Sequence, residues 1–84
     1  MTRDLTDQAV RMLLIAVGAD PRVDAPDFDL SFEELGLDSL ARTEFATRVK
    51  ELTGVTVEDD LAPSTTPSAI RALVHDRLDP SRDA

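Results

Sequence analysis

Apolar residues recur at helical spacing in three separate segments of the chain, and this pattern limits the fold more than any other feature. Within each segment they return every three or four positions, as they do along one face of an α-helix. These positions are Leu5, Ala9, Val10, Leu13, Leu14, Ala16 and Val17, then Leu40, Ala41, Phe45, Ala46, Val49 and Leu52, and finally Ile70, Leu73, Val74 and Leu78. We therefore expect an all-α fold with three main helices.

Residues that favour helix ends flank the three segments. Asp and Thr side chains accept hydrogen bonds from the first free N–H groups of a helix, Pro suits its first turn, and Gly suits its end. The expected boundaries are Gly18 after the first helix, Asp38 and Gly54 around a second helix from Ser39 to about Thr53, and Thr66 with Pro67 at the start of the third.

The segment between Gly18 and Asp38 lacks a helical period and predicts a loop of about 20 residues. Loops of this length in compact domains tend to be functional or internally packed. Ser31 and Glu34 have the spacing of a capping box for one helical turn. Apolar anchors to the core are available at Val23, Phe28, Leu30, Phe32, Leu35 and Leu37. We expect the loop to be ordered.

The remaining segment, after Gly54, predicts an extended linker and one short helix. Val55-Thr56-Val57 is too short to form a sheet without a partner strand, and a single helical turn is expected around Glu58 to Ala62. The expected fold is a small four-helix bundle, with three main helices and one short helix. The 84 residues are expected to form one domain, 1–84, with a core of about residues 5–78 and a flexible tail at 79–84.

Charge and composition exclude several functions. Nine Lys and Arg residues against 17 Asp and Glu residues give a net charge of −8, which disfavours nucleic acid as a partner and favours basic proteins. The chain has no cysteine, and therefore neither a disulfide framework nor a thiol nucleophile. No signal-peptide pattern or long apolar run indicates secretion or a membrane span, so a cytoplasmic location is expected. The chain is also expected to be a monomer.

Ser39 has an unusual position at the start of the second predicted helix. Asp38 is the expected N-cap and Ser39 the first helical residue. A phosphate on the Ser39 oxygen would lie at the positive end of the helix dipole, beside free N–H donors. The position therefore suits a phosphoester.

The block Phe32-Glu33-Glu34-Leu35-Gly36-Leu37-Asp38-Ser39-Leu40, with Glu44 beyond it, resembles the acyl carrier proteins at their 4'-phosphopantetheine attachment site. The family's short motif, Asp-Ser-Leu, stands here as Asp38-Ser39-Leu40. Around it the family has an apolar helix and a long loop before the motif, a helix of about four turns after it, and a short final helix. The resemblance covers essentially the whole chain.

The resemblance implies a carrier whose Ser39 bears a 4'-phosphopantetheine arm derived from coenzyme A, which makes the chain a phosphoprotein. The terminal thiol of the arm would hold acyl groups as thioesters. Asp38 and Leu40 would lie beside the arm, and Arg42, three residues after Ser39, would share its face and approach the phosphate. Expected partners are a phosphopantetheinyl transferase, a malonyl or acyl transferase, a ketosynthase and tailoring enzymes.

Acidic residues are the expected partner contacts. Glu44 falls where the family commonly has an acidic contact residue, although it also has the spacing for a helix-stabilising pair with Arg48. The second helix is formally neutral, because Asp38, Glu44 and Glu51 balance Arg42, Arg48 and Lys50. Negative charge flanks it instead, and we expect partners to recognise Glu33 and Glu34 before it and Asp59 and Asp60 after it.

The chain is most similar to the discrete carriers of bacterial type II (aromatic) polyketide synthases, which act in antibiotic biosynthesis. The lead-in Phe32 to Gly36, the pair Gly54-Val55 and the pair Thr66-Pro67 support this class. Thr43 departs from the apolar residue that many members have there. The alternatives are a fatty acid synthase carrier, a peptidyl or aminoacyl carrier, and a helical interaction module without any modification.

Two other readings are weaker. Asp27, Asp29 and Ser31 at alternate positions, with Asp38 at the twelfth, mimic a calcium loop, but Phe32 replaces its essential glycine, so no metal site is expected. Catalysis by the chain itself is not expected either, because no general base is near Ser39 in sequence. His75 is expected to be a surface residue.

Overall fold

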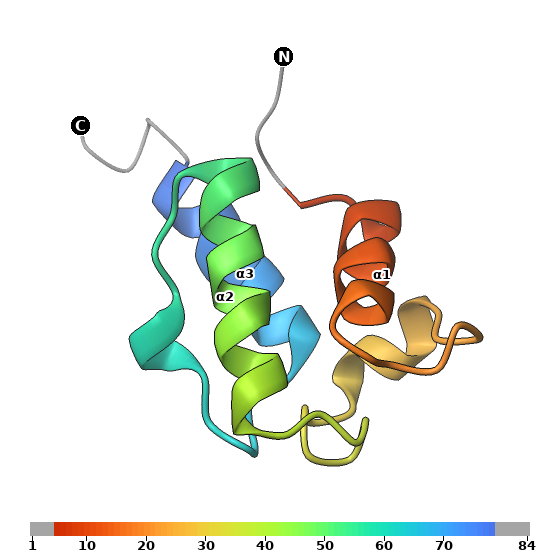
Figure 1. Ribbon diagram of the computed structural model, residues 1–84. Coiled ribbons are helices and arrows are strands. Elements are labelled where there is room, and N and C mark those ends of the chain that lie inside the picture. Colours follow the sequence, from red (N-terminus) through yellow and green to blue (C-terminus); the bar gives the residue numbers. More distant parts are fainter. Residues whose placement is uncertain (1–4, 79–84) are drawn as a thin grey trace.

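Three α-helices form the body of the protein in the computed structural model, which describes residues 5–78 (Figure 1). They are α1 (Asp7–Ala16), α2 (Ser39–Thr53) and α3 (Pro67–Leu78), and two short 3-10 helices, η1 (Ala25–Asp29) and η2 (Glu58–Asp60), lie in the connections. The described residues contain no strand. The predicted all-α fold is confirmed, although the short fourth helix is only the 3-10 turn η2.

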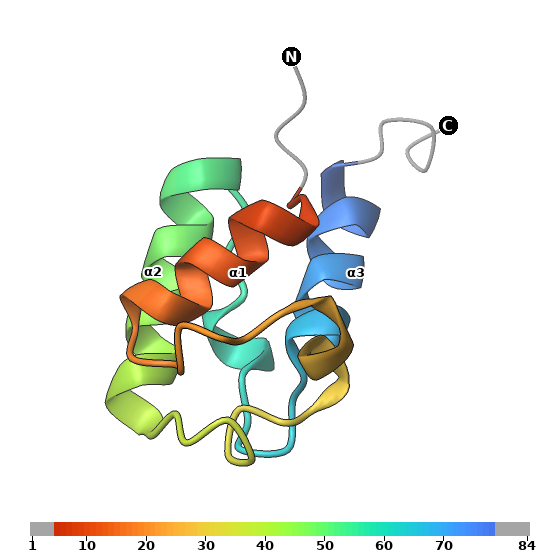
Figure 2. The ribbon, with the colours of Figure 1, turned by 90° about the vertical axis from the view of Figure 1, so that its right-hand side faces the viewer.

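The helices surround a common core. α1 lies against α2, η1 lies against α3, and η2 lies against α2. Figure 2 shows α1 crossing in front of the other two helices, with the long loop beneath them. No helix in the described part of the chain is long and apolar enough to span a membrane.

The predicted helix ends are confirmed, because each depends on local capping. Asp38 accepts a hydrogen bond from the Ala41 N–H at 2.9 Å, and Thr66 accepts one from the Ala69 N–H at 3.1 Å. Gly54 ends α2 in the left-handed conformation, at φ 80°, where its lack of a side chain avoids strain.

The start of α1 differs slightly from the expectation. Thr6 is the N-cap, and its hydroxyl accepts from the Ala9 N–H at 3.1 Å. Leu5 therefore precedes the helix instead of belonging to it. Leu5 and Val10 are both buried, as expected for a hydrophobic staple that fixes how the chain enters a helix.

The core is built from α-helices and loop anchors together. Phe32 from the loop and Phe45 from α2 are both completely buried, and their rings meet edge to face with centroids 5.0 Å apart. Val49 of α2, Ile70 and Val74 of α3 are also buried, while Leu73 and Leu78 pack against the core from partly buried positions.

Three residues assigned to inward-facing stripes are exposed, and those assignments were wrong. Leu40 is 76% exposed because it lies nine positions before the buried Val49, about half a turn around the helix at roughly 100° per residue. Leu52 is 56% exposed, in the last turn of α2 and two turns beyond the Phe45 layer. Ala16 is exposed because the buried position at the end of α1 belongs to Val17.

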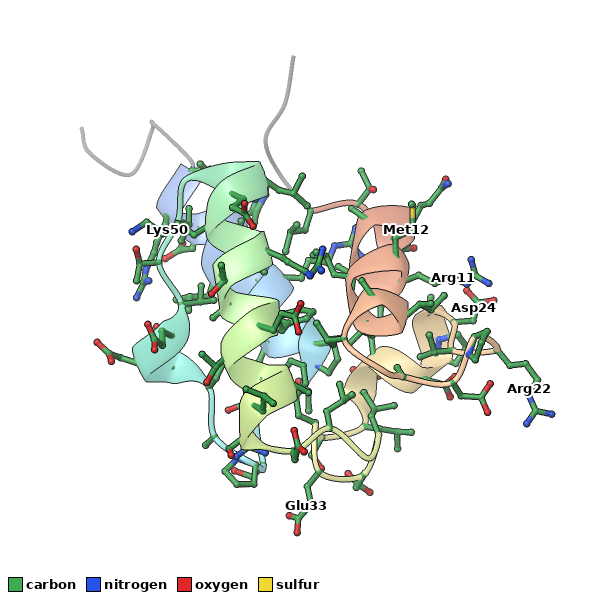
Figure 3. The ribbon with its side chains drawn as sticks, in the orientation of Figure 1. Arg11, Met12, Arg22, Asp24, Glu33 and Lys50 are labelled. Carbon is green, nitrogen blue, oxygen red and sulfur yellow. The ribbon has the colours of Figure 1, made fainter. Side chains whose placement is uncertain are left out.

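The loop between α1 and α2 is anchored as predicted, with one exception. Val23, Phe28, Phe32 and Leu37 are buried and Leu35 packs against them, but Leu30 is 38% exposed. The backbone of the loop is also held by α1, because the Arg11 guanidinium donates to the carbonyls of Pro21 and Val23, each at 3.0 Å (Figure 3).

The short helix η1 was not expected from the sequence. Asp24 caps it by accepting from the Ala25 N–H at 2.8 Å, Pro26 lies in its first turn, and Asp27 accepts from the Asp24 N–H at 3.1 Å. After α2, residues 55–57 have no regular secondary structure, and Val55 and Val57 are buried. Val57 is not extended as predicted, because its ψ of 7° already turns the chain into η2. The predicted tail, residues 79–84, lies outside the described residues.

Candidate functional site

Ser39 is the first residue of α2 and is exposed to solvent. Its hydroxyl has no hydrogen-bond partner among the described residues. The carboxylate of Asp38, the N-cap, accepts a hydrogen bond from the Ala41 N–H, and its carbonyl oxygen accepts one from the Arg42 N–H, each at 2.9 Å. The capping contacts therefore leave the Ser39 oxygen available for a covalent partner.

The backbone around Ser39 favours an anion. Within the described part of the chain, the N–H groups of Ser39 and Leu40 have no acceptor, as is usual in the first turn of a helix. These free donors and the helix dipole both favour negative charge at this end of α2. A phosphate bound to Ser39 would meet this environment.

The chain that leads into Ser39 is fixed by a hydrogen-bonded turn. The predicted capping box is present. The Glu34 carboxylate accepts from the Ser31 N–H at 2.9 Å, and the Ser31 hydroxyl accepts from the Glu34 N–H at 3.0 Å. Gly36 closes the turn at φ 77°, and the Leu37 N–H then donates to the Phe32 carbonyl at 2.9 Å. Because Leu37 is buried, Asp38 and Ser39 start from an anchored position.

Arg42 lies beside Ser39, as its spacing predicts. Its guanidinium donates to the Leu37 carbonyl at 3.1 Å, which uses one of its five N–H donors. Arg42 and Ser39 together line the same two surface hollows at the start of α2.

The first hollow, of about 110 Å³, has Thr43, Glu58 and Leu61 as its other lining residues. Glu58 and Leu61 come from η2 and its end, and sequence reasoning missed them because no local pattern places this segment beside Ser39. Thr43 donates its hydroxyl to the Ser39 carbonyl at 3.0 Å, a common way for a helical threonine to satisfy its polar group. Its departure from the family pattern therefore adds no unpaired hydroxyl to the hollow.

The structure separates the predicted acidic contact residues into different surroundings. Glu33 lines the second hollow beside Ser39, whereas Glu34 lines a different hollow on the loop. The Ser31 backbone N–H that bonds to Glu34 lowers the pKa of this carboxyl, and the Ser31 side chain adds to the effect.

The other acids include both paired and exposed side chains. Glu44 pairs with Arg48 at 3.0 Å, as its spacing predicts. Asp60 pairs with Arg77 of α3 at 3.3 Å, and Arg77 also donates to the Thr56 carbonyl at 2.6 Å. Asp59 is exposed. Asp60 therefore has a structural contact that the sequence did not indicate.

Two of the residues that have the spacing of a calcium loop accept hydrogen bonds from the loop itself. Asp27 accepts from the Asp24 N–H and Ser31 from the Glu34 N–H. Among the described residues, no group of three or more His, Cys, Asp or Glu side chains is arranged to hold a metal ion. His75 is exposed, in the last turn of α3.

Comparisons with known proteins show which family the chain resembles. A family model described as a phosphopantetheine attachment site matches residues 11–74. The granaticin polyketide synthase acyl carrier protein of Streptomyces violaceoruber is 40% identical over 75 residues, which cover 84% of this chain and 88% of the relative. The actinorhodin polyketide synthase acyl carrier protein of Streptomyces coelicolor is 38% identical over 76 residues, covering 87% and 88%.

An anthracycline acyl carrier protein of Streptomyces peucetius is 38% identical over 65 residues, which cover 75% of this chain and 77% of the relative. No solved structure matches the chain significantly.

Proposed function

This chain belongs to the phosphopantetheine-binding acyl carrier proteins, and we propose that Ser39 is its attachment residue. The observation that supports this assignment is the exposed and unbonded Ser39 hydroxyl at the first position of α2. Modification joins this oxygen to the phosphorus of the phosphopantetheinyl group of coenzyme A. Adenosine 3',5'-bisphosphate leaves, and the hydroxyl proton passes to the transferase.

The residues around Ser39 fit the phosphate of the arm. The free N–H groups of Ser39 and Leu40 and the uncommitted donors of Arg42 would hold this phosphate. Asp38 caps the first turn of α2. The exposed Leu40 offers apolar surface beside the attachment point.

The arm supplies a thiol, which this chain of 84 residues without cysteine lacks, and acyl groups are held on that thiol as thioesters. The protein provides attachment and a recognisable surface, and we infer that it is a substrate of other enzymes and has no catalytic activity of its own. It would work as a monomer in the cytoplasm, where coenzyme A is available.

We assign the carrier to a type II polyketide synthase. The granaticin, actinorhodin and anthracycline relatives support this class over a fatty acid synthase carrier. Its cargo would be a malonyl unit and a growing poly-β-ketone. The enzymes it meets would be a phosphopantetheinyl transferase, a malonyl or acyl transferase, a ketosynthase and tailoring enzymes.

The pathway can be tested with the phosphopantetheinylated protein. We expect it to accept a malonyl group and then support chain extension by an aromatic polyketide ketosynthase, which intact-protein mass spectrometry follows. Under the same conditions, a fatty acid ketosynthase should extend it more slowly. Extension only by the fatty acid enzyme would contradict the polyketide assignment while leaving the carrier role in place.

A further inference from the structure

A third surface hollow lies on the loop between α1 and α2, separate from the two beside Ser39. Its volume is about 270 Å³. We refer to it as the loop hollow. Its lining combines apolar residues, acidic residues and one basic residue: Val23, Leu30 and Leu35, then Asp20, Asp27 and Glu34, and Arg22. Leu30 is 38% exposed, so apolar surface is accessible there.

The loop that contains the hollow is strongly acidic. Residues 20–35 contain six acidic residues and one arginine, a net charge of −5 out of −8 for the whole chain. α2 contains two acidic and three basic residues, a net charge of +1. A basic partner is therefore attracted to the loop more strongly than to the helix that begins with Ser39.

The acidic side chains of the loop hollow are held in place but retain acceptor capacity. Glu34 accepts from the Ser31 N–H through one oxygen, and Asp27 accepts from the Asp24 N–H through one oxygen. A carboxylate has about four lone-pair sites, so each can accept further hydrogen bonds from a cation. The geometry is fixed before a partner binds, which reduces the entropy cost of binding.

Arg22 shows that a guanidinium can bind at this rim. It contacts the Asp20 carboxylate through two nitrogens, at 3.3 and 3.2 Å, and this hydrogen bonding lowers the pKa of Asp20. The Arg22 side chain is 91% exposed and projects from the outer edge of the loop (Figure 3). Such an exposed pair is weak and can be exchanged for a partner's cation.

The loop hollow is next to the surface that an enzyme must cover to reach Ser39. Glu33 and Gly36 line the hollow beside Ser39, while Glu34 and Leu35, between them in sequence, line the loop hollow. The two linings are therefore joined through residues 33–36, and an enzyme that binds over Ser39 would have the loop hollow close by. The transferase that attaches the arm is such an enzyme.

We propose that the loop hollow is a docking site for an arginine or lysine side chain of the phosphopantetheinyl transferase that modifies Ser39. The aliphatic part of the side chain would lie against Leu30 and Leu35, and its cation would meet Asp27 and Glu34. This proposal rests on the assignment of Ser39 as the attachment residue. It adds a recognition surface outside α2.

The test measures transfer from coenzyme A to the apo protein by a broad-specificity transferase, as a function of apo-protein concentration. Leu30→Ala and Glu34→Gln should each raise the KM about three- to tenfold, the range expected for one apolar or charge-assisted contact, with kcat nearly unchanged. Glutamine at position 34 retains the oxygen that accepts from Ser31. Added salt should reduce the effect of Glu34→Gln but not that of Leu30→Ala.

The matched controls are Glu51→Gln and Leu52→Ala, which make the same chemical changes at exposed positions in the last turn of α2. Both should leave the KM within about twofold of wild type, as exposed substitutions outside a contact usually do. Arg22→Gln should lower the KM, because it frees Asp20 for the partner. A purely structural role for the loop does not predict this improvement.

The outcomes separate the two proposals. If the wild-type protein is modified at Ser39 and the loop variants have the same KM as the controls, the docking site is wrong and the attachment site stands. A raised KM for Arg22→Gln also overturns the docking site. If Ser39 is not modified at all, both proposals fail.

Discussion

Among single residues, Arg42 connects the fold most directly with the proposed phosphate site. Its guanidinium donates to the Leu37 carbonyl and lines both hollows beside Ser39. In the phosphopantetheinylated protein, Arg42→Met should change the phosphorus NMR shift of the phosphodiester, while Arg42→Lys should restore most of it because the positive charge is retained. The control Lys50→Met, on the exposed surface of α2, should leave the shift unchanged. An unchanged shift in Arg42→Met would show that Arg42 does not contact the phosphate.

Substitution of Phe45 tests the packing of the core. The side chain is completely buried and meets Phe32 edge to face, so Phe45→Ala should lower the free energy of unfolding by about 3 to 5 kcal/mol. Chemical denaturation measures this loss. Leu52→Ala, at a position that is 56% exposed, should cost less than about 1 kcal/mol. A loss below about 1 kcal/mol for Phe45→Ala would contradict the observed core.

At the scale of elements, the sequence predicts helix ends better than helix faces. Asp38, Gly54, Thr66 and the Ser31–Glu34 box act on groups within a few residues, so their effects are visible in sequence. The exposure of Leu40 follows from the helical period, which places it half a turn from Val49, and the prediction overlooked this. Leu52 lies on the face of Phe45, and its exposure depends on what covers the last turn in space, which the sequence does not show. η1 was missed because its cap, Asp24, lies in an acidic run without an apolar period.

Sequence spacing is equally limited for the surroundings of Ser39, the proposed attachment residue. Ser39, Asp38 and Arg42 are close in sequence, and their arrangement follows from the helical period. Glu58 and Leu61 reach the same hollow only through the path of the chain after α2. Their position beside Ser39 could not be inferred from spacing.

The turn before Ser39 gives a prediction about pH. Hydrogen bonding to Ser31 lowers the Glu34 pKa in the folded state, so the folded protein favours the ionised carboxylate. This contribution is present above the unfolded pKa of about 4.3 and is lost as the pH falls through the lower folded pKa. The stability of Glu34→Gln should therefore decrease less than that of wild type on acidification, measured by urea denaturation between neutral and acidic pH. Parallel pH profiles for the two proteins would contradict the predicted role of Glu34.

At the scale of the whole molecule, the distribution of charge defines the surface that partners meet. The net charge of −8 is concentrated in the loop and around η2, while α2 is close to neutral. The double variant Glu33→Lys and Glu34→Lys should therefore slow acyl transfer to the carrier mainly through a higher KM, and added salt should reduce the difference. Glu44→Gln should have a smaller effect, because Arg48 at 3.0 Å already offsets its charge.

Asp59 and Asp60 call for separate variants, because Asp60 also bonds Arg77. Asp59→Lys should raise the KM without destabilising the fold, whereas Asp60→Lys should do both. Circular dichroism during thermal unfolding separates the two effects. If Glu44→Gln slows transfer more than the double reversal at Glu33 and Glu34, partners recognise α2 and the predicted distribution of roles is wrong.

The most direct test of the central claim is the mass of the intact protein after incubation with coenzyme A and a broad-specificity phosphopantetheinyl transferase. Wild type should gain the mass of a single phosphopantetheinyl group, and Ser39→Ala should gain none. Ser64→Ala, which removes another exposed serine, should be modified like wild type. Modification that persists in Ser39→Ala, or that fails in wild type under conditions that load a known carrier, would contradict the assignment of Ser39.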